Sequence, residues 1–426
     1  MTDPLPASRI FKVTAELVRD FYETHPYPPP IEDLNDYRRR WRGKKRRRVD
    51  FHLLWPKQPF REDHTILIAG CGTSQAAKYA MRWPKAKVIG IDFSAKSIEH
   101  THKLKQKYSL ANLEAHQLSL EEVGKLGAEY DLIVSTGVLH HLPDPDAGLA
   151  ALSACLAPAG AMHLMVYAPY GRTGIYMMQD YCRRLKIGTS SSEIRDLAAS
   201  LQALPPNHPL IPLLRSSPDF RQEAALADAL LNPLDRAYSV DEFFRFIDAA
   251  DLKFVRWIRQ APYLPQCGGL TQVPHSALMR QLPDQEHFAA MELFRGNMLR
   301  HSAILFRSDL EPPAQPINFD SDAWLDYVPI RVSTAINVKD KLPAGTAAVL
   351  INQAHTQTDI YLPVNDLQEG MVEQIDGTRT IRQIMGKTAV DATEARTLFM
   401  RLWWYDQVVF DASKPGNSTK PARRAQ

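Results

Sequence analysis

The sequence predicts an α/β fold, a doubly wound and mostly parallel sheet, with a second and smaller domain after it. Two observations lead to this prediction. Between residues 64 and 170, short apolar runs alternate with helix-prone segments at the spacing of strand–helix–strand units. A Gly-x-Gly turn, with glycines at 70 and 72, follows the first of these runs. At 426 residues the chain is also long for a single hydrophobic core.

Seven apolar runs are predicted strands. They cover residues 65–70, 86–92, 113–119, 130–138, 161–169, 253–260 and 302–308. The segments between them read as helices, such as residues 145–159 before the fifth strand. Another follows Ser239, a good N-cap with an acidic first turn after it. Parallel sheets bind ligands at the carboxyl ends of their strands, so a site is expected in the loops that follow these runs.

The chain is predicted to have five parts: an N-terminal helical lid with a basic segment, a sheet domain, a linker, a winged-helix-like domain and a disordered tail. Their residues are 1–63, 64–309, 310–345, 346–413 and 414–426. Inside the sheet domain, residues 171–235 are helical and proline-rich and follow the fifth strand. An insertion there lies above the ligand edge, so a helical cap is expected.

Composition sets further expectations. The longest apolar runs are shorter than the roughly 20 residues that a membrane span needs, and the N-terminus lacks the apolar core of a signal peptide. The four cysteines are widely spaced and form no Cys-x-x-Cys pair, which argues against a disulfide framework or a zinc site. These features favour a cytoplasmic protein.

The glycine turn is suited to an adenosine cofactor. Asp92 ends the second predicted strand 22 residues after Gly70, where an acid can accept hydrogen bonds from ribose hydroxyls. Ser74 stands where the dinucleotide fingerprint has its third glycine. That glycine lets the helix pack beside a pyrophosphate, so its absence argues against a dinucleotide.

The segments "AGCGTSQ", "IGIDFS" and "YDLIVSTGVLHHLPDP" resemble the class I S-adenosylmethionine-dependent methyltransferases, and the resemblance covers about residues 64–309. It implies a Rossmann-like sheet of seven strands, the last antiparallel, and S-adenosylmethionine as cofactor. The residues it implies for cofactor binding are Gly70, Cys71, Gly72, Thr73, Asp92, Phe93, Gln117, Leu118, Thr136, Gly137 and Val138. The glycine turn would line the methionine part and Asp92 the ribose. Phe93 and residues 116–118 would lie by the adenine, and residues 135–141 under the sulfonium.

Two positions depart from the family pattern. Ile68 stands where the family usually has an acid two residues before the first glycine, which removes an indirect support of the cofactor's amino group. Gln117 replaces an acid that often ends the third strand, although an amide can still hydrogen-bond to adenine.

His141 and Tyr167 are the predicted catalytic residues. Methyl transfer needs close approach of nucleophile and methyl, and it needs a base only when the nucleophile carries a proton. By analogy His141, at the mouth of the fourth strand, is a better candidate than His140; its alternative role is to orient the loop. Tyr167 equally fits plain packing. No cysteine or acid stands at metal-ligand spacing near the histidine pair, so no metal is expected.

Four residues are predicted to meet the substrate. Tyr170 and Arg172 follow the fifth strand, where Arg172 would clamp an anionic acceptor or remain a solvated loop charge. Tyr22 and Tyr27 belong to the "FYETHPYPP" segment, which in the resembling family often folds over the cofactor. Packing alone is the alternative for both.

The net charge is +3, yet residues 38–48 contain nine basic side chains in eleven positions. Such a run would give salt-sensitive binding to nucleic acid. No recognised RNA-binding module accompanies it, and a solvated helix face or attraction of an acidic peptide explains it equally. Nucleic acid is therefore not the expected partner.

The C-terminal module, from "LINQAHTQTDIYLPV" to "LFMRLWWYDQVVF", is similar to small winged-helix domains of the PQQ-biosynthesis chaperone type. The resemblance implies that a peptide adds as an extra strand to the edge of its sheet. A regulatory or dimerising appendage is the alternative, so a homodimer stays open. Of Trp403 and Trp404, at least one is expected in the core.

These observations favour a methyltransferase that acts on a peptide or protein held under the helical cap. Two alternatives remain: a small-molecule methyltransferase of secondary metabolism, and a non-catalytic scaffold that binds the cofactor for regulation. The acceptor atom is left open by the sequence.

Overall fold

The computed structural model describes residues 7–309, 317–388 and 390–414. The chain divides into two compact units, which we call the sheet unit and the C-terminal unit. The sheet unit comprises Met1–Arg42, Glu62–Phe254 and Glu292–Leu310; the C-terminal unit comprises Gly43–Arg61, Val255–Met291 and Glu311–Gln426. No described helix has both the length and the apolarity to cross a bilayer.

A seven-stranded sheet has the order β3-β2-β1-β4-β5-β7-β6. The strands are β1 (Thr65–Ala69), β2 (Lys87–Asp92), β3 (Leu113–Gln117), β4 (Tyr130–Thr136), β5 (Leu156–Tyr167), β6 (Leu252–Trp257) and β7 (Arg300–Arg307). β1 pairs in parallel with β2 and β4, whereas β7 runs antiparallel to β5. The predicted fold, with its antiparallel last strand, is confirmed. β1 is fully buried beyond Thr65, as expected for a central parallel strand.

The helices that connect the strands begin at recognisable caps. Ser94 accepts the Ser97 N–H to start α5 (Ala95–Tyr108), and Asp144 accepts the Ala147 N–H to start α6 (Pro145–Ala154). The remaining helices of this part are α4 (Gln75–Arg82), α11 (Val240–Asp248) and α13 (Asp284–Arg295). These caps place the strand-to-helix loops at the edge where a ligand is expected.

One predicted boundary is wrong. The helix expected to run to residue 159 ends at Ala154, and β5 starts at Leu156. Its pairing with β4 shifts register between Tyr130 and Leu132. Gly160 permits this, because a Cβ there would lie 2.8 Å from the Tyr130 carbonyl oxygen.

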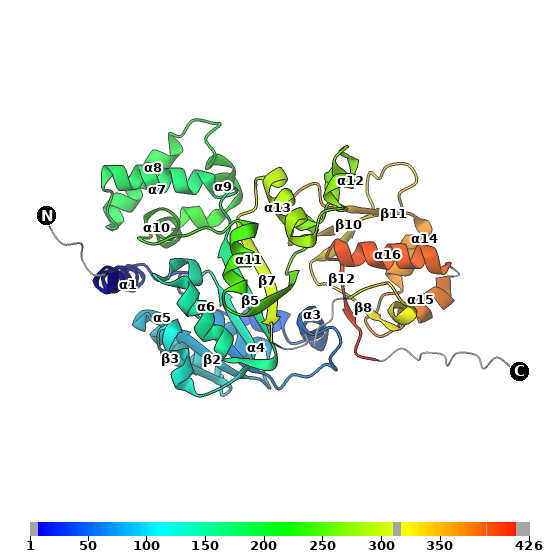
Figure 1. Ribbon diagram of the computed structural model, residues 1–426, viewed down its shortest axis with the longest axis horizontal. Coiled ribbons are helices and arrows are strands. Elements are labelled where there is room, and N and C mark those ends of the chain that lie inside the picture. The colour runs from blue at the N-terminus through cyan, green and yellow to red at the C-terminus, as the bar shows by residue number, and fades with distance from the viewer. Residues whose placement is uncertain (1–6, 310–316, 389, 415–426) are drawn as a thin grey trace, which may run out of the picture. The chain divides into compact units, whose positions relative to one another are not determined.

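Residues 171–235 form a helical layer with its own hydrophobic core, which we call the cap. Its helices are α7 (Thr173–Leu185), α8 (Ser191–Gln202), α9 (Ile211–Ser216), η3 (Pro218–Arg221) and α10 (Glu223–Leu231), gathered in Figure 1 on one side of the sheet unit. Phe21, from α1 (Ala7–Thr24), belongs to the same core as Ile194 and Leu226. The N-terminal helix therefore packs as part of the cap.

The C-terminal unit contains two small sheets, β11-β10-β9 and β12-β8. Its strands are β8 (Val328–Arg331), β9 (Ala335–Val338), β10 (Ala348–Asn352), β11 (Leu362–Val364) and β12 (Val408–Asp411). Its helices include α3 (Lys44–Leu54), α12 (Ser276–Met279), α14 (Asp366–Glu373), α15 (Ile381–Thr388) and α16 (Ala392–Trp404). Strands β8 and β9 lie in the stretch that the sequence suggested to be a linker. Trp403 is buried, as expected of at least one of the two tryptophans.

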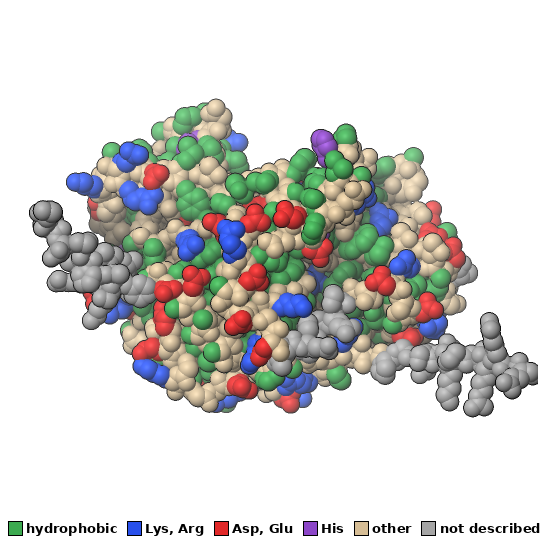
Figure 2. Space-filling view, in the orientation of Figure 1, with side chains coloured by type: hydrophobic (Ala, Val, Ile, Leu, Met, Phe, Trp, Pro, Cys, Tyr) green, Lys and Arg blue, Asp and Glu red, His purple; other side chains and the backbone are tan. Residues whose placement is uncertain are grey.

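The basic run is divided between two helices. Arg38, Arg39 and Arg40 end α2 (Asn35–Arg40) and are exposed. Arg48, on α3, instead donates to the Gly377 carbonyl oxygen at 2.6 Å and pairs with a β12 carboxylate at 3.1 Å. Figure 2 shows acidic and basic side chains interspersed over one face of the molecule. At least one residue of the run thus holds the C-terminal unit together.

Candidate active site

The glycine turn between β1 and α4 has the backbone conformation that glycine favours. Gly70 and Gly72 have φ angles of 72° and 51°. The N–H groups of Gly70 and Cys71 both donate to the Ile91 carbonyl oxygen, at 2.9 and 2.8 Å. A Cβ on Gly70 would lie 2.4 Å from Val138 Cγ2, so the loop after β4 comes close to the turn. The two predicted cofactor segments therefore meet.

Asp92, at the end of β2, faces the same turn. Its Oδ2 accepts the Gly72 N–H at 2.8 Å, and its Oδ1 accepts the Ser94 N–H at 2.9 Å. Desolvation by burial raises the pKa of Asp92 to about 6, against the two backbone hydrogen bonds, which lower it. A carboxylate with spare lone pairs thus lies beside a turn whose two glycines carry no side chain.

The predicted adenine contacts cluster around Asp92. The Gln117 side-chain amide donates to the Phe93 carbonyl oxygen at 3.2 Å. The Leu118 N–H donates to the Asp92 carbonyl oxygen at 3.0 Å. The ends of β2 and β3 therefore bring these four residues together, as the parallel register requires.

The N-terminal segment lies over the turn. Thr73 Oγ1 donates to the Pro28 carbonyl oxygen at 2.8 Å. A Cβ on Gly72 would lie 3.2 Å from Pro28 Cδ and 3.4 Å from the Tyr27 carbonyl oxygen. The lid predicted from "HPYPPP" is thus in contact with the predicted cofactor residues, with Tyr27 at the turn through its backbone.

Residues 136–138 close the other side of this edge. The Gln75 side-chain amide donates to Thr136 Oγ1 at 3.0 Å, which ties the start of α4 to the end of β4. Gly137 has a φ of 78°, and its N–H donates to the Met165 carbonyl oxygen at 3.3 Å. The glycine allows the chain to turn out of β4 into η2 (Leu139–His141).

The two histidines of η2 are buried in different hydrogen-bonding states. His141 Nδ1 donates to the Leu234 carbonyl oxygen at 2.7 Å, which leaves Nε2 as a lone-pair acceptor. His140 is fully buried, its ring lies 4.0 Å from that of Tyr167, and neither of its nitrogens has a hydrogen-bond partner. Burial lowers the pKa of His140 well below its ordinary value, so the ring is neutral near pH 7.

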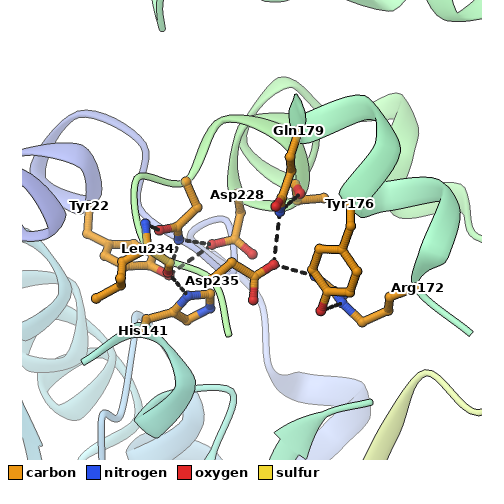
Figure 3. Close-up of polar contacts among 10 residues, drawn as sticks. Tyr22, His141, Arg172, Tyr176, Gln179, Asp228, Leu234 and Asp235 are labelled. Atoms are coloured by element: carbon orange, nitrogen blue, oxygen red, sulfur yellow. Dashed lines mark hydrogen bonds and ion pairs between the residues drawn. The ribbon is translucent and has the colours of Figure 1, made fainter. Parts of the chain in front are cut away.

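Arg172 and Asp235 form a buried pair above Tyr167. The guanidinium lies over the Tyr167 ring at 3.5 Å, donates to Asp235 Oδ2 at 2.8 Å and donates to the Tyr176 hydroxyl at 3.0 Å. Gln179 also donates to Asp235 Oδ2, at 2.9 Å (Figure 3). Oδ1 of the same carboxylate is buried without a partner. Arg172, predicted as a clamp for an anionic acceptor, already holds a carboxylate from the cap.

Tyr22 joins the lid to this network. Its hydroxyl donates to Asp228 Oδ1 at 2.9 Å and accepts from the Asn232 amide at 3.0 Å, and its ring meets His141 edge-on (Figure 3). Burial raises the pKa of both Tyr22 and Asp228, which favours their protonated forms. Tyr170, in contrast, is 41% exposed and joins none of these contacts among the described residues.

Comparison with known proteins agrees with this geometry. Residues 67–162 match the family model of a methyltransferase domain. The matched residues lie within the sheet unit. The fold is also that of PKMT2 from Rickettsia typhi in complex with AdoHcy, with a TM-score of 0.61, 16% sequence identity and coverage of 90% of this chain and 77% of that one.

Two curated relatives are similar in sequence to parts of the chain. It is 32% identical to an uncharacterized protein of Synechococcus sp. over 56% of its length, and 33% identical to the trans-aconitate 2-methyltransferase of Deinococcus radiodurans over 28%. The chain spans 59% and 43% of these relatives. The enzyme class and cofactor predicted from the sequence agree with the match to a methyltransferase domain.

Two acids of the candidate site were absent from the sequence prediction. Asp228 and Asp235 both come from the cap insertion and carry no motif. Asp235 approaches His140 and His141 so closely that one ligand-type atom of each residue lies within 4.8 Å of the others. The prediction of no acid near the histidines took into account only residues close to them in sequence, whereas Asp235 lies more than 90 residues further along the chain. Its buried, unpaired oxygen becomes visible only in three dimensions.

Proposed function

We propose that this protein is an S-adenosylmethionine-dependent methyltransferase whose acceptor is held between the loop after β4 and the cap. The observation that carries this proposal is the edge formed by Gly70, Gly72 and Asp92, in a domain that matches a methyltransferase family model. A side chain on either glycine would fill the turn, and Asp92 has lone pairs for a ribose. The residues therefore fit the cofactor.

When bound, S-adenosylmethionine supplies an electrophilic methyl group on a sulfonium. The protein must bring a nucleophile into line with that methyl, and positioning accounts for much of the acceleration. The loop at 136–141 is proposed to hold the reacting groups, with His141 Nε2 as the acceptor of the nucleophile's proton. Burial raises the pKa of Tyr167 above its ordinary value, so that phenol acts as a neutral partner and not as a base.

A peptide or protein acceptor is the proposal for the whole chain. It is supported by the resemblance of the module at 346–413 to peptide-binding winged-helix domains and by the exposed edge strand β9, whose central residues Ile336 and Asn337 face solvent. A small-molecule acceptor is the second candidate. Similarity to a trans-aconitate methyltransferase and the enclosed polar network under the cap favour it.

The first experiment is isothermal titration of the full chain with S-adenosylmethionine and, separately, with NAD. Binding of the first and not of the second is expected. Asp92→Ala should abolish that binding, while Glu121→Gln, on the exposed start of η1 (Leu120–Leu126), should leave it unchanged. Binding of neither compound would contradict the proposal. Binding of S-adenosylmethionine that His141→Ala leaves intact, without turnover of any acceptor by the wild type, would favour the regulatory scaffold.

A further inference from the structure

We propose that the acceptor atom is the nitrogen of a primary amine, bound by His140, His141 and Asp235. This inference rests on the proposed methyltransferase function and names its substrate class. The three residues come from η2 and from the loop after α10, and sequence spacing does not group them. One ligand-type atom of each residue lies within 4.8 Å of those of the other two. Both nitrogens of His140 and Oδ1 of Asp235 are buried without a hydrogen-bond partner.

The free atoms are mainly hydrogen-bond acceptors. His141 donates through Nδ1 to the Leu234 carbonyl oxygen, so its Nε2 presents a lone pair. Asp235 uses Oδ2 for Arg172 and Gln179, so its Oδ1 presents lone pairs as well (Figure 3). Neutral His140 adds one further lone pair. A ligand group that suits this set must donate two or three hydrogen bonds.

An amine meets that requirement better than the other common methyl acceptors. A carboxylate or carbonyl would set lone pairs against lone pairs, and a hydroxyl donates only one hydrogen bond. Leaving buried acceptors unpaired costs about 1–3 kcal/mol for each group. The cluster therefore discriminates in favour of a group with several N–H bonds.

The spacing suits a hydrogen-bonded nitrogen. A nitrogen centred among three atoms that all lie within 4.8 Å of one another is at most about 2.8 Å from each, an ordinary N–H···O length. The Arg172 guanidinium, bonded to the same carboxylate, offsets the attraction of that carboxylate for a divalent cation.

Burial and the charged neighbours act on the protonation state of such an amine. The three side chains are shielded from solvent, which favours a neutral amine; the Asp235 carboxylate favours an ammonium ion, and the Arg172 guanidinium paired with it offsets that attraction. The proton of the incoming ammonium passes to His141 Nε2. The nitrogen lone pair then forms the N–C bond as the S–C bond breaks, and that electron pair stays on sulfur. The products are a methylammonium and the uncharged thioether.

The test uses the full chain and S-adenosylmethionine labelled in its methyl group. Three probes are compared: a random hexapeptide pool with free amines, the same pool with every amine acetylated, and the same pool with every carboxyl amidated. A parallel set compares linear primary amines with alcohols of equal length. Label is expected in the amines and in the amidated pool, and acetylation should abolish it. Mass spectrometry locates the added methyl.

The outcomes separate this inference from the proposed function. Failure to bind S-adenosylmethionine overturns both. If the protein binds S-adenosylmethionine but labels the acetylated pool or the alcohols, or labels no probe, the amine proposal is wrong. The proposed cofactor site is not affected by that result. Stoichiometric zinc or another divalent metal in the purified protein, lost in Asp235→Asn, would show a cation site instead.

Asp235→Asn provides a second measurement. The amide presents an N–H2 in place of a free lone pair, so amine methylation should fall about 100-fold, while the Kd for S-adenosylmethionine stays unchanged. The unchanged Kd shows that the variant is folded. Asp248→Asn, on the exposed end of α11, is the matched control and should keep full activity. Equal rates for the two variants would refute a role for Asp235 in holding the amine.

Discussion

The Asp92 carboxylate is desolvated and accepts two backbone hydrogen bonds. Its protonation should affect both the free energy of unfolding and the affinity for S-adenosylmethionine, with opposite dependence on pH. Its pKa in the folded protein is about 6, above the ordinary 3.8. Between these values the folded protein binds more protons than the unfolded chain, so the contribution of Asp92 to the free energy of unfolding falls as pH rises from 4 to 6.

Cofactor affinity should change with the opposite sign. Ribose hydroxyls donate to the ionised carboxylate, so the affinity for S-adenosylmethionine should rise about tenfold from pH 5 to a plateau above pH 7. Isothermal titration across this range measures it. Asp92→Asn should bind weakly and without this pH dependence. A flat profile in the wild type, or an unchanged profile in the variant, would be inconsistent with ionised Asp92 as the ribose contact.

The Arg172–Asp235 pair should show strong coupling in unfolding experiments. Both side chains are almost completely buried, so Arg172→Met leaves an uncompensated carboxylate and should lower the free energy of unfolding by about 3–5 kcal/mol. The double variant Arg172→Met/Asp235→Leu should lose less free energy of unfolding than the two single variants lose together, because it removes both charges.

Urea unfolding of the four proteins in this cycle gives the coupling energy. The exposed pair Arg183–Asp180 on α7 is the control, and Arg183→Met should change stability by about 1 kcal/mol or less. Additive losses for Arg172 and Asp235 would show that water reaches the pair and screens it.

At the scale of elements, α1 is held by the cap. Phe21 is buried in the cap core, and one turn earlier Leu17 is 55% exposed on the same helix. Phe21→Ala should lower the free energy of unfolding by about 3 kcal/mol through lost apolar contacts, and should release the N-terminal segment.

Thermal unfolding and limited proteolysis before residue 30 measure these two effects. Leu17→Ala, which removes an exposed side chain of similar kind, should leave both unchanged. If cleavage of the segment is as slow in Phe21→Ala as in the wild type, the contacts of Thr73 and Tyr22 hold the lid without the cap core.

At the scale of the whole molecule, the C-terminal unit is assembled from distant parts of the chain. β12 pairs with β8, β10 pairs with β9, and Asp406 binds the buried Arg256 at 2.9 Å. Deletion of 346–426 therefore removes the partners of two strands and of a buried charge. The truncated chain should aggregate or lose the rest of this unit, and such a deletion would not report on peptide recognition alone.

Size-exclusion chromatography and hydrogen exchange test this expectation. Deletion of 415–426 is the matched control and should leave a protein that elutes and exchanges like the full chain. Asp406→Ala should lower the free energy of unfolding by about 3–5 kcal/mol, because Arg256 then stays buried without its carboxylate. A monomeric 1–345 fragment with protected β8 amides would show that the unit does not need its C-terminal strands.

Features whose causes lie within a few residues of one another can be predicted from the sequence alone. Alternating strands and helices, the glycine turn, the acid at the end of β2 and the caps at Ser94 and Ser239 depend on local spacing, and the structure has them. A cap hydrogen bond joins residues three apart, so its signal is in the sequence. The fold and the place of the cofactor edge follow from such signals.

The contribution of the cap to the site, in contrast, depends on tertiary packing. Leu234 accepts a hydrogen bond from His141, and Asp235 approaches both histidines, because the cap folds back over the end of β4. The start of β5 was mispredicted for a similar reason, since its pairing with β4 overrides the helix propensity of residues 155–159. Contacts between residues so distant in sequence depend on how elements pack, and no local pattern records them.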